Sequence, residues 1–131
     1  MAKPTRIRFL VLAWVGTGAA CAYLTRVALA AANTTIQSEL ELTDLQMGDV
    51  LAAFFVGYLI FQIPGGWLGV RFGRRATLAG LAACGSVATV WTAMADGMPG
   101  LRYSRIILGL AQAGMVPCTA SVLKDWWRRP A

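Results

Sequence analysis

Apolar residues occur in four long runs, and short polar segments separate these runs from one another. The runs are residues 9–32, 50–70, 76–95 and 106–123. A helix needs about 20 residues to cross a hydrocarbon core of about 30 Å. Three of the runs carry no charged residue, and the first contains only Arg26. The pattern therefore predicts an all-α membrane protein with four transmembrane helices.

Three polar connections join the predicted helices. They are residues 33–46, 69–75 and 96–100. The second and third contain Gly or Pro at positions typical of tight turns. We therefore expect irregular connections between four helices.

Basic residues are concentrated on one side of the predicted helices. Nine of the twelve fall before the first run, after the second and after the fourth: Lys3, Arg6, Arg8, Arg71, Arg74, Arg75, Lys124, Arg128 and Arg129. Lys and Arg are enriched in short cytoplasmic loops. We therefore expect a multi-pass protein of the cell membrane, the inner membrane in a Gram-negative cell, with a cytoplasmic N-terminus. The expected regions are a cytoplasmic tail (1–8), a four-helix membrane part (9–123) and the start of a cytoplasmic loop (124–131).

Composition agrees with a lipid environment. The chain is 57% hydrophobic and 14% charged, with a mean hydropathy of +0.59, which is more apolar than an ordinary soluble domain. A net charge of +6 would suggest nucleic-acid binding in a soluble protein. Because the basic residues follow the loops of one side, we read the charge as a topology signal and expect the lipid bilayer, not nucleic acid, as partner.

The residue types exclude several chemistries. The chain has no histidine, which removes the commonest metal ligand and the commonest general base at neutral pH. Cys21, Cys84 and Cys118 lie in apolar runs without metal-ligand spacing, so we interpret them as packing residues. We expect no enzyme activity, no metal and no cofactor.

The N-terminus has a second interpretation. The basic residues 3–8, the apolar run after them and the small-residue pattern at 28–30 resemble a cleaved signal peptide. The apolar run is longer than the usual hydrophobic region of such a peptide. We therefore favour a transmembrane helix.

Two arginines are expected inside the membrane. A charge at the centre of a spanning helix costs roughly 2.5–3.5 kcal/mol, so it needs either a function or a route to the interface. At 1.5 Å per residue, Arg26 and Arg105 both lie about 10 Å from the outer ends of their helices. Two guanidinium groups at one depth can hold a carboxylate or phosphate by bidentate hydrogen bonds. The alternative is that each side chain extends to the headgroups.

Three polar residues extend this predicted anion site. Tyr23 shares a helical face with Arg26, and Gln112 shares one with Arg105. Tyr58 lies near the middle of the second apolar run. The alternative for Tyr58 is a structural hydrogen bond to a neighbouring helix.

Small residues are frequent in the apolar runs, and they let helices approach closely. The glycines that we expect to act in packing are Gly16, Gly18, Gly57, Gly65, Gly66, Gly109 and Gly114.

The segment GGWLGVRFGRR at residues 65–75 resembles the loop signature of the major facilitator superfamily. The matching residues are Gly66, Arg71, Gly73, Arg74 and Arg75. The segments at 54–69, 22–26 (AYLTR) and 105–117 (RIILGLAQAGMVP) narrow the resemblance to the anion:cation symporters, which include sugar-acid and organic-anion carriers.

This resemblance implies a carrier with twelve helices, whose substrate site lies near the bilayer midplane between two six-helix halves. By position, it implies that Arg26 and Arg105 coordinate the anion and that Tyr23 and Tyr58 lie beside the substrate. The matching residues of 65–75 would form the loop that controls the inward gate.

Three positions depart from the family pattern. Val70 replaces the Asp that tethers the loop, so the control of the inward gate is in doubt. Thr25 and Gln112 replace an Asp and a Glu that the family associates with proton coupling, and no run contains a carboxylate. Neutral side chains cannot carry a proton through a cycle, so we expect no proton coupling through these two positions.

The predicted function is secondary transport of a small organic anion, a sugar acid or another carboxylate, by alternating access. The chain has 131 residues and the family continues beyond this point, so we expect an N-terminal part whose partner is the remainder of the transporter. One alternative is a non-transporting four-span protein that binds a helical partner. A small multidrug exporter is disfavoured, because it needs a glutamate in the first helix.

Overall fold

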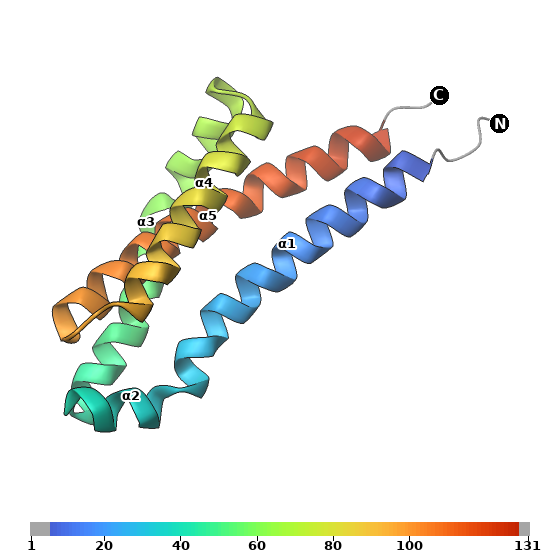
Figure 1. Ribbon diagram of the computed structural model, residues 1–131. Helices are drawn as coiled ribbons and strands as arrows, with labels where there is room; N and C mark the ends of the chain where they lie inside the picture. Colours follow the sequence, from blue (N-terminus) through green and yellow to red (C-terminus); the bar gives the residue numbers. More distant parts are fainter. Residues whose placement is uncertain (1–5, 129–131) are drawn as a thin grey trace.

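The computed structural model describes residues 6–128, and these form five helices (Figure 1). They are α1 (Arg6–Ala31), α2 (Asn33–Leu40), α3 (Asp44–Arg71), α4 (Arg74–Ala93) and α5 (Met98–Arg128). Four helices in the described part are long and apolar enough to cross a membrane: Phe9–Ala31, Asp44–Arg71, Arg74–Ala93 and Met98–Asp125. The all-α class and the four predicted transmembrane helices are confirmed.

The first predicted connection is not irregular throughout. The short helix α2 occupies most of it, and α3 begins at Asp44. Thr43 caps α3: its Oγ1 accepts a hydrogen bond from the Gln46 amide nitrogen at 3.3 Å, and its own N–H donates to the Gln46 side-chain oxygen at 2.9 Å. This reciprocal capping box satisfies N–H groups that the helix start leaves free. The helix therefore starts well before the apolar run.

The other two connections are shorter than predicted. Only Phe72 and Gly73 separate α3 from α4, and Gly73 has φ of +86°, which glycine adopts at low cost. Pro99 lies in the first turn of α5, where a missing N–H breaks no hydrogen bond. The predicted tail 1–8 and loop 124–131 lie partly outside the described residues, and their described parts continue α1 and α5.

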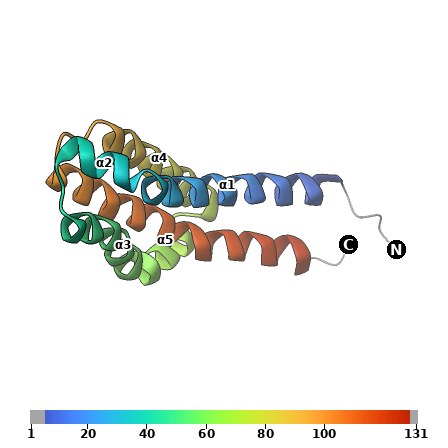
Figure 2. The same ribbon diagram turned by 90° about the horizontal axis from the view of Figure 1, so that it is seen from below.

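Figures 1 and 2 show that α1 runs alongside α5, whereas α3 and α4 cross α5 obliquely. The helix α2 lies beside the connection between α4 and α5 at one end of the bundle. The start of α1 and the end of α5 lie together at the opposite end. The chain thus alternates in direction, as helices joined by short connections do.

The helices α3 and α5 pack backbone against backbone. A Cβ atom added at Gly57 or Gly109 would overlap a backbone carbonyl group of the opposite helix. A Cβ atom added at Gly65 would overlap the Cα atom of Gly114, and one added at Gly114 would first meet the Leu81 side chain of α4. The predicted packing role is confirmed for these four glycines, because a side chain at any of them would overlap atoms of a neighbouring helix.

The helix α1 is attached much less closely. A Cβ atom added at Gly16 or Gly18 would have no atom of another helix within 4 Å. Among the described residues, these two glycines therefore take no part in helix packing. Leu29 is the only buried residue of α1 among those described, and it joins Met47, Val50 and Leu101 in an apolar cluster at the end near α2. Polar contacts described below provide the other attachment of α1.

Candidate functional site

A cavity with a volume of about 680 Å³ lies between α1, α4 and α5, with one wall from α3. Four of the five predicted site residues line it: Tyr23, Arg26, Tyr58 and Gln112. The rest of the wall is mostly apolar and includes Trp14, Leu78 and Val116. Pockets for small molecules commonly have this size and this combination of an apolar wall with a few polar groups.

Two aromatic rings of α3 hold the side chain of Arg26. Its guanidinium carbon lies 5.0 Å from the ring centroid of Phe54 and 4.9 Å from that of Phe55. Phe54 in turn stacks on Tyr58, with ring centroids 6.0 Å apart. Cation–π contacts of this kind orient a guanidinium without neutralising it. Arg26 forms no ion pair with the described residues, so its charge is available to an anion in the cavity.

Gln112 connects α5 to α1. Its side-chain Nε2 donates to the Ala22 carbonyl oxygen at 2.9 Å and to Thr25 Oγ1 at 3.1 Å. The Thr25 hydroxyl donates to the same Ala22 carbonyl at 2.9 Å. The two neutral residues that replace the family's acids are therefore in direct contact.

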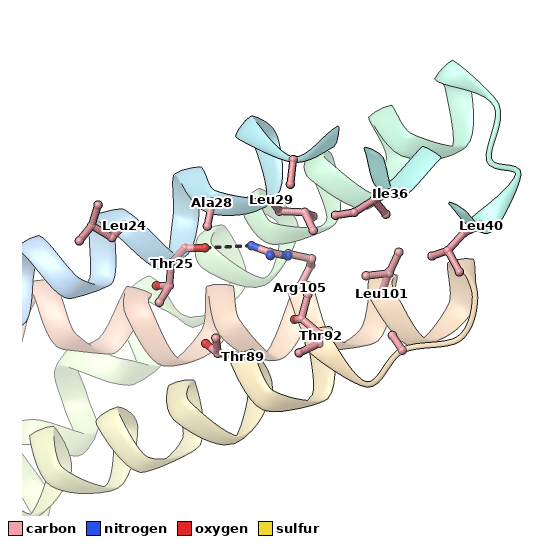
Figure 3. Close-up of a pocket in the computed structure, with 13 residues that line it drawn as sticks. Leu24, Thr25, Ala28, Leu29, Ile36, Leu40, Thr89, Thr92, Leu101 and Arg105 are labelled. Atoms are coloured by element: carbon pink, nitrogen blue, oxygen red, sulfur yellow. Dashed lines mark hydrogen bonds between the residues drawn. The ribbon is translucent and has the colours of Figure 1, made fainter. Parts of the chain in front are cut away.

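Arg105 is buried, with only 5% of its surface exposed. Its Nη1 donates to the Thr25 carbonyl oxygen at 3.3 Å (Figure 3). A side chain enclosed in this way does not extend to the headgroup region, so that alternative does not describe Arg105. Because Thr25 precedes Arg26, the two arginines come to neighbouring levels of the bundle.

The two arginines nevertheless line different cavities. Arg105 lines a second cavity of about 490 Å³, nearer α2, and Arg26 does not. Thr25 lines the second cavity and Gln112 the first, so their hydrogen bond lies between the two. The anion-binding role of all five residues stays a prediction, but the geometry does not join the arginines in one pocket.

The predicted gating loop is tied to α5 through Arg74. Its Nη1 forms an ion pair with the Asp125 carboxylate and donates to the Ser121 carbonyl oxygen at 3.1 Å. Val70, which replaces the family's Asp, is 83% exposed and cannot tether the loop. The loop therefore has a charged tether after all, from a different residue than the one the family pattern indicates.

The other loop residues play smaller structural parts. The Arg71 guanidinium lies 5.2 Å from the ring centroid of Trp67. An added Cβ at Gly66 would make only ordinary contact with Pro117, and Arg75 is exposed. Gly73 forms the turn itself. Their role in gating stays a prediction.

Sequence reasoning missed three contributors: Phe54 and Phe55, which hold Arg26, and Asp125, which pairs with Arg74. One indication of the aromatic pair was present in the sequence: Phe54 and Phe55 lie about one helical turn before Tyr58, and therefore on the same side of the helix. No local pattern links Asp125 to a loop residue 51 positions earlier. Among the described residues, no group of three or more His, Cys, Asp or Glu side chains is placed to hold a metal ion.

Comparison with known proteins identifies relatives over most of the chain. Residues 15–131 match the Major Facilitator Superfamily. A D-galactonate transporter of Escherichia coli O6:H1 is 36% identical over 126 residues, which cover 96% of this chain and 29% of that protein. A probable sulfoacetate transporter of Cupriavidus necator is 35% identical over 105 residues, covering 80% of this chain and 24% of that protein.

A hexuronate transporter of Escherichia coli K12 is 30% identical over 127 residues, covering 97% of this chain and 29% of that protein. The chain thus spans less than a third of the length of these three curated relatives. Galactonate and hexuronates are sugar acids, so the predicted resemblance to the sugar-acid branch is confirmed together with the family. The relatives are transporters and not enzymes. This chain therefore belongs to the Major Facilitator Superfamily, as a multi-pass membrane protein related to sugar-acid transporters.

Proposed function

We propose that this chain forms the arginine-bearing wall of the substrate site in a secondary transporter of a small organic anion, with a sugar acid as the substrate. The observation that carries the proposal is Arg26, whose guanidinium forms no ion pair with the described residues and lies on the wall of a cavity large enough for such a molecule. The proposed partner is the remainder of such a transporter, whose second half would close the cavity during alternating access.

The chemistry of the cavity fits the two parts of a sugar acid. The guanidinium of Arg26 can bind the carboxylate through two parallel N–H groups. Tyr23 is 65% exposed and Tyr58 lines the same wall, so their hydroxyl groups can bind the hydroxyl groups of the sugar chain. Gln112 lines the cavity too, although its amide N–H groups already bind α1.

Uptake of radiolabelled D-galactonate by cells that express the protein from its complete reading frame tests this proposal. Arg26→Gln removes a charged hydrogen bond worth about 1.5–3 kcal/mol, so we expect uptake to fall roughly 10- to 100-fold. The matched control is Arg102→Gln, because Arg102 is half exposed and pairs with Asp49 at 3.3 Å, away from the cavity. Full uptake by Arg26→Gln, with normal membrane insertion of both variants, would contradict the proposal.

We further propose that the start of α1 and the turn between α3 and α4 face the cytoplasm, and that α2 faces outward. The support is the distribution of basic residues. In a variant whose three cysteines are replaced by alanine, Glu39→Cys should react with an impermeant maleimide in intact cells. Arg75→Cys should react only after permeabilisation. The opposite pattern would reverse the orientation.

One observation favours a second function, namely the open position of the exposed Gly16 on α1, where an added Cβ atom would meet nothing within 4 Å. A helical partner could pack there without transport. Crosslinking from Gly16→Cys to another protein, combined with the absence of any anion uptake by the complete gene product, would support this alternative.

A further inference from the structure

The turn between α3 and α4 carries two arginines whose charge no described residue neutralises. Arg71 is the last residue of α3, and Arg75 is the second residue of α4. Both side chains are exposed, and neither forms an ion pair with a described residue. The third arginine of the turn differs, because Arg74 pairs with Asp125. The surface of the turn therefore keeps two positive charges that an anion can bind.

The turn also lacks an acidic residue of its own. Val70 stands where the family pattern has an aspartate, and its side chain is 83% exposed beside Arg71. The first turn of α4 contains no acidic residue either. Residues 65–76 thus include three arginines and no carboxylate. A surface with charge of one sign attracts groups of the opposite charge from its surroundings.

The length of α3 brings the turn to the headgroup layer of a membrane. The helix has 28 residues, which span about 42 Å at 1.5 Å per residue. A bilayer with its headgroup regions is about 40–45 Å thick. Because α3 is apolar enough to cross the membrane, its last residue, Arg71, lies at the level of the lipid phosphates.

Two exposed aromatic side chains lie beside the arginines. Trp67 is 57% exposed and Phe72 is 62% exposed. The Arg71 guanidinium lies 5.2 Å from the ring centroid of Trp67. Trp side chains are enriched at membrane–water interfaces, where one part meets acyl chains and another meets headgroups. A phospholipid can contact both the arginines and the rings, whereas a soluble phosphate can contact only the arginines.

We propose that the turn between α3 and α4 binds an anionic phospholipid, with Arg71 and Arg75 at its phosphate and Trp67 and Phe72 beside its acyl chains. Arginine binds phosphate oxygens through pairs of parallel N–H groups. None of these four residues lines either cavity described above. The lipid site is therefore separate from the anion site proposed at Arg26 and does not depend on the transported substrate.

Binding of phosphatidylglycerol tests the proposal. The protein is expressed from its complete reading frame, purified in detergent and titrated with this lipid, and native mass spectrometry measures the bound fraction. Phosphatidylcholine with the same acyl chains carries a phosphate but no net charge, so it should bind more weakly. Arg71→Gln and Arg75→Gln should each weaken binding of phosphatidylglycerol about fivefold. The matched control is Arg102→Gln at the start of α5, which removes the same charge and should change binding by less than about twofold.

Substitution of Val70 tests the proposal with both arginines in place. Val70→Asp puts a carboxylate beside Arg71 and should weaken binding of phosphatidylglycerol at least about fivefold. Val70→Asn has nearly the same shape without the charge, so it should change binding by less than about twofold. The position is exposed, so both variants should fold, and unchanged helical circular dichroism checks this.

Three results would overturn the proposal. The first is equal binding of phosphatidylglycerol and phosphatidylcholine by the wild type. The second is wild-type affinity in Arg71→Gln and Arg75→Gln, or equal affinity of Val70→Asp and Val70→Asn. The third is displacement of the lipid by sn-glycerol 3-phosphate, which would indicate a site for soluble phosphate esters. Unchanged galactonate uptake by Arg26→Gln, with the lipid preference intact, would count only against the function proposed at Arg26.

Discussion

The side-chain amide of Gln112 donates a hydrogen bond to Thr25 Oγ1 at 3.1 Å, and this contact joins α5 to α1 between two arginines. Arg105 donates to the carbonyl group of the same threonine. The helix α1 has little apolar contact with the bundle at this level, so these hydrogen bonds set its position. The contact between Gln112 and Thr25 joins two side chains that are neutral and carry no carboxyl group.

We predict that Gln112→Glu makes uptake of the substrate dependent on pH. A protonated carboxyl group can still donate to the Ala22 carbonyl oxygen, whereas the ionised form cannot and is repelled by it. Uptake by the variant should therefore fall as pH rises from about 5 to 8, while wild-type uptake changes little over that range. Radiolabelled uptake in proteoliposomes at fixed membrane potential measures the difference.

The control for this variant is Gln112→Met, which removes the donor without adding a titratable group. It should reduce uptake equally at every pH. A wild-type proton flux that disappears on mutation of Gln112 or Thr25 would show that these neutral residues do take part in proton coupling.

We predict that Gly57→Ala and Gly109→Ala each destabilise the protein. The added methyl group would meet a backbone carbonyl group of the opposite helix, which has no flexible part to move away. Overpacking of this kind costs about 1–3 kcal/mol. Thermal unfolding in detergent should therefore occur at a lower temperature than for the wild type.

The matched control for the packing prediction is Gly16→Ala. No other atom lies within 4 Å of the added group, and alanine favours a helix over glycine by about 1 kcal/mol. This variant should be as stable as the wild type or slightly more stable. Equal unfolding temperatures for all three variants would contradict the close packing of α3 against α5.

We predict a small, measurable coupling between Arg74 and Asp125. Their side chains are 38% and 54% exposed, so the ion pair should contribute only about 0.2–1 kcal/mol to stability. In a double-mutant cycle, Arg74→Ala should therefore cost less in the presence of Asp125→Asn than in the wild type. The part of the cost that remains reflects the second hydrogen bond, to Ser121.

Arg75→Ala serves as the comparison, because Arg75 is exposed and has the same charge on the same turn. It should show no coupling to Asp125→Asn. If the two arginines behave alike, the tether described for Arg74 does not form in solution.

The transmembrane helices could be predicted from the sequence because hydropathy over about 20 residues is a strong signal. The short helix α2 could not, since its polar sequence has no long apolar run. Its Ile36 and Leu40 pack against the apolar cluster of Leu29, Met47, Val50 and Leu101, to which three other helices contribute. Tertiary packing of this kind, more than intrinsic propensity, stabilises short helices.

The sequence predicted which residue types form the candidate site and at what depth to expect them. It did not predict which cavity each side chain lines. Counting residues along each helix predicted a similar depth for Arg105 and Arg26, and the Arg105 side chain does contact Thr25, the residue before Arg26. Which face each helix turns inward depends on how the helices pack. The apolar residues of α1 surround the helix almost evenly, so periodicity did not show that the two arginines line separate cavities.

The aromatic pair beside Arg26 has a consequence for how substrate preference can change. Phe54 and Phe55 belong to α3, which packs closely against α5, whereas Arg26 belongs to α1, which has few close contacts. The orientation of the Arg26 guanidinium, which we propose to bind the substrate, thus depends on two uncharged side chains of another helix. Replacing Phe55 by an aliphatic residue would redirect the guanidinium, so selectivity can evolve at a position that carries no charge and that α1 does not contain.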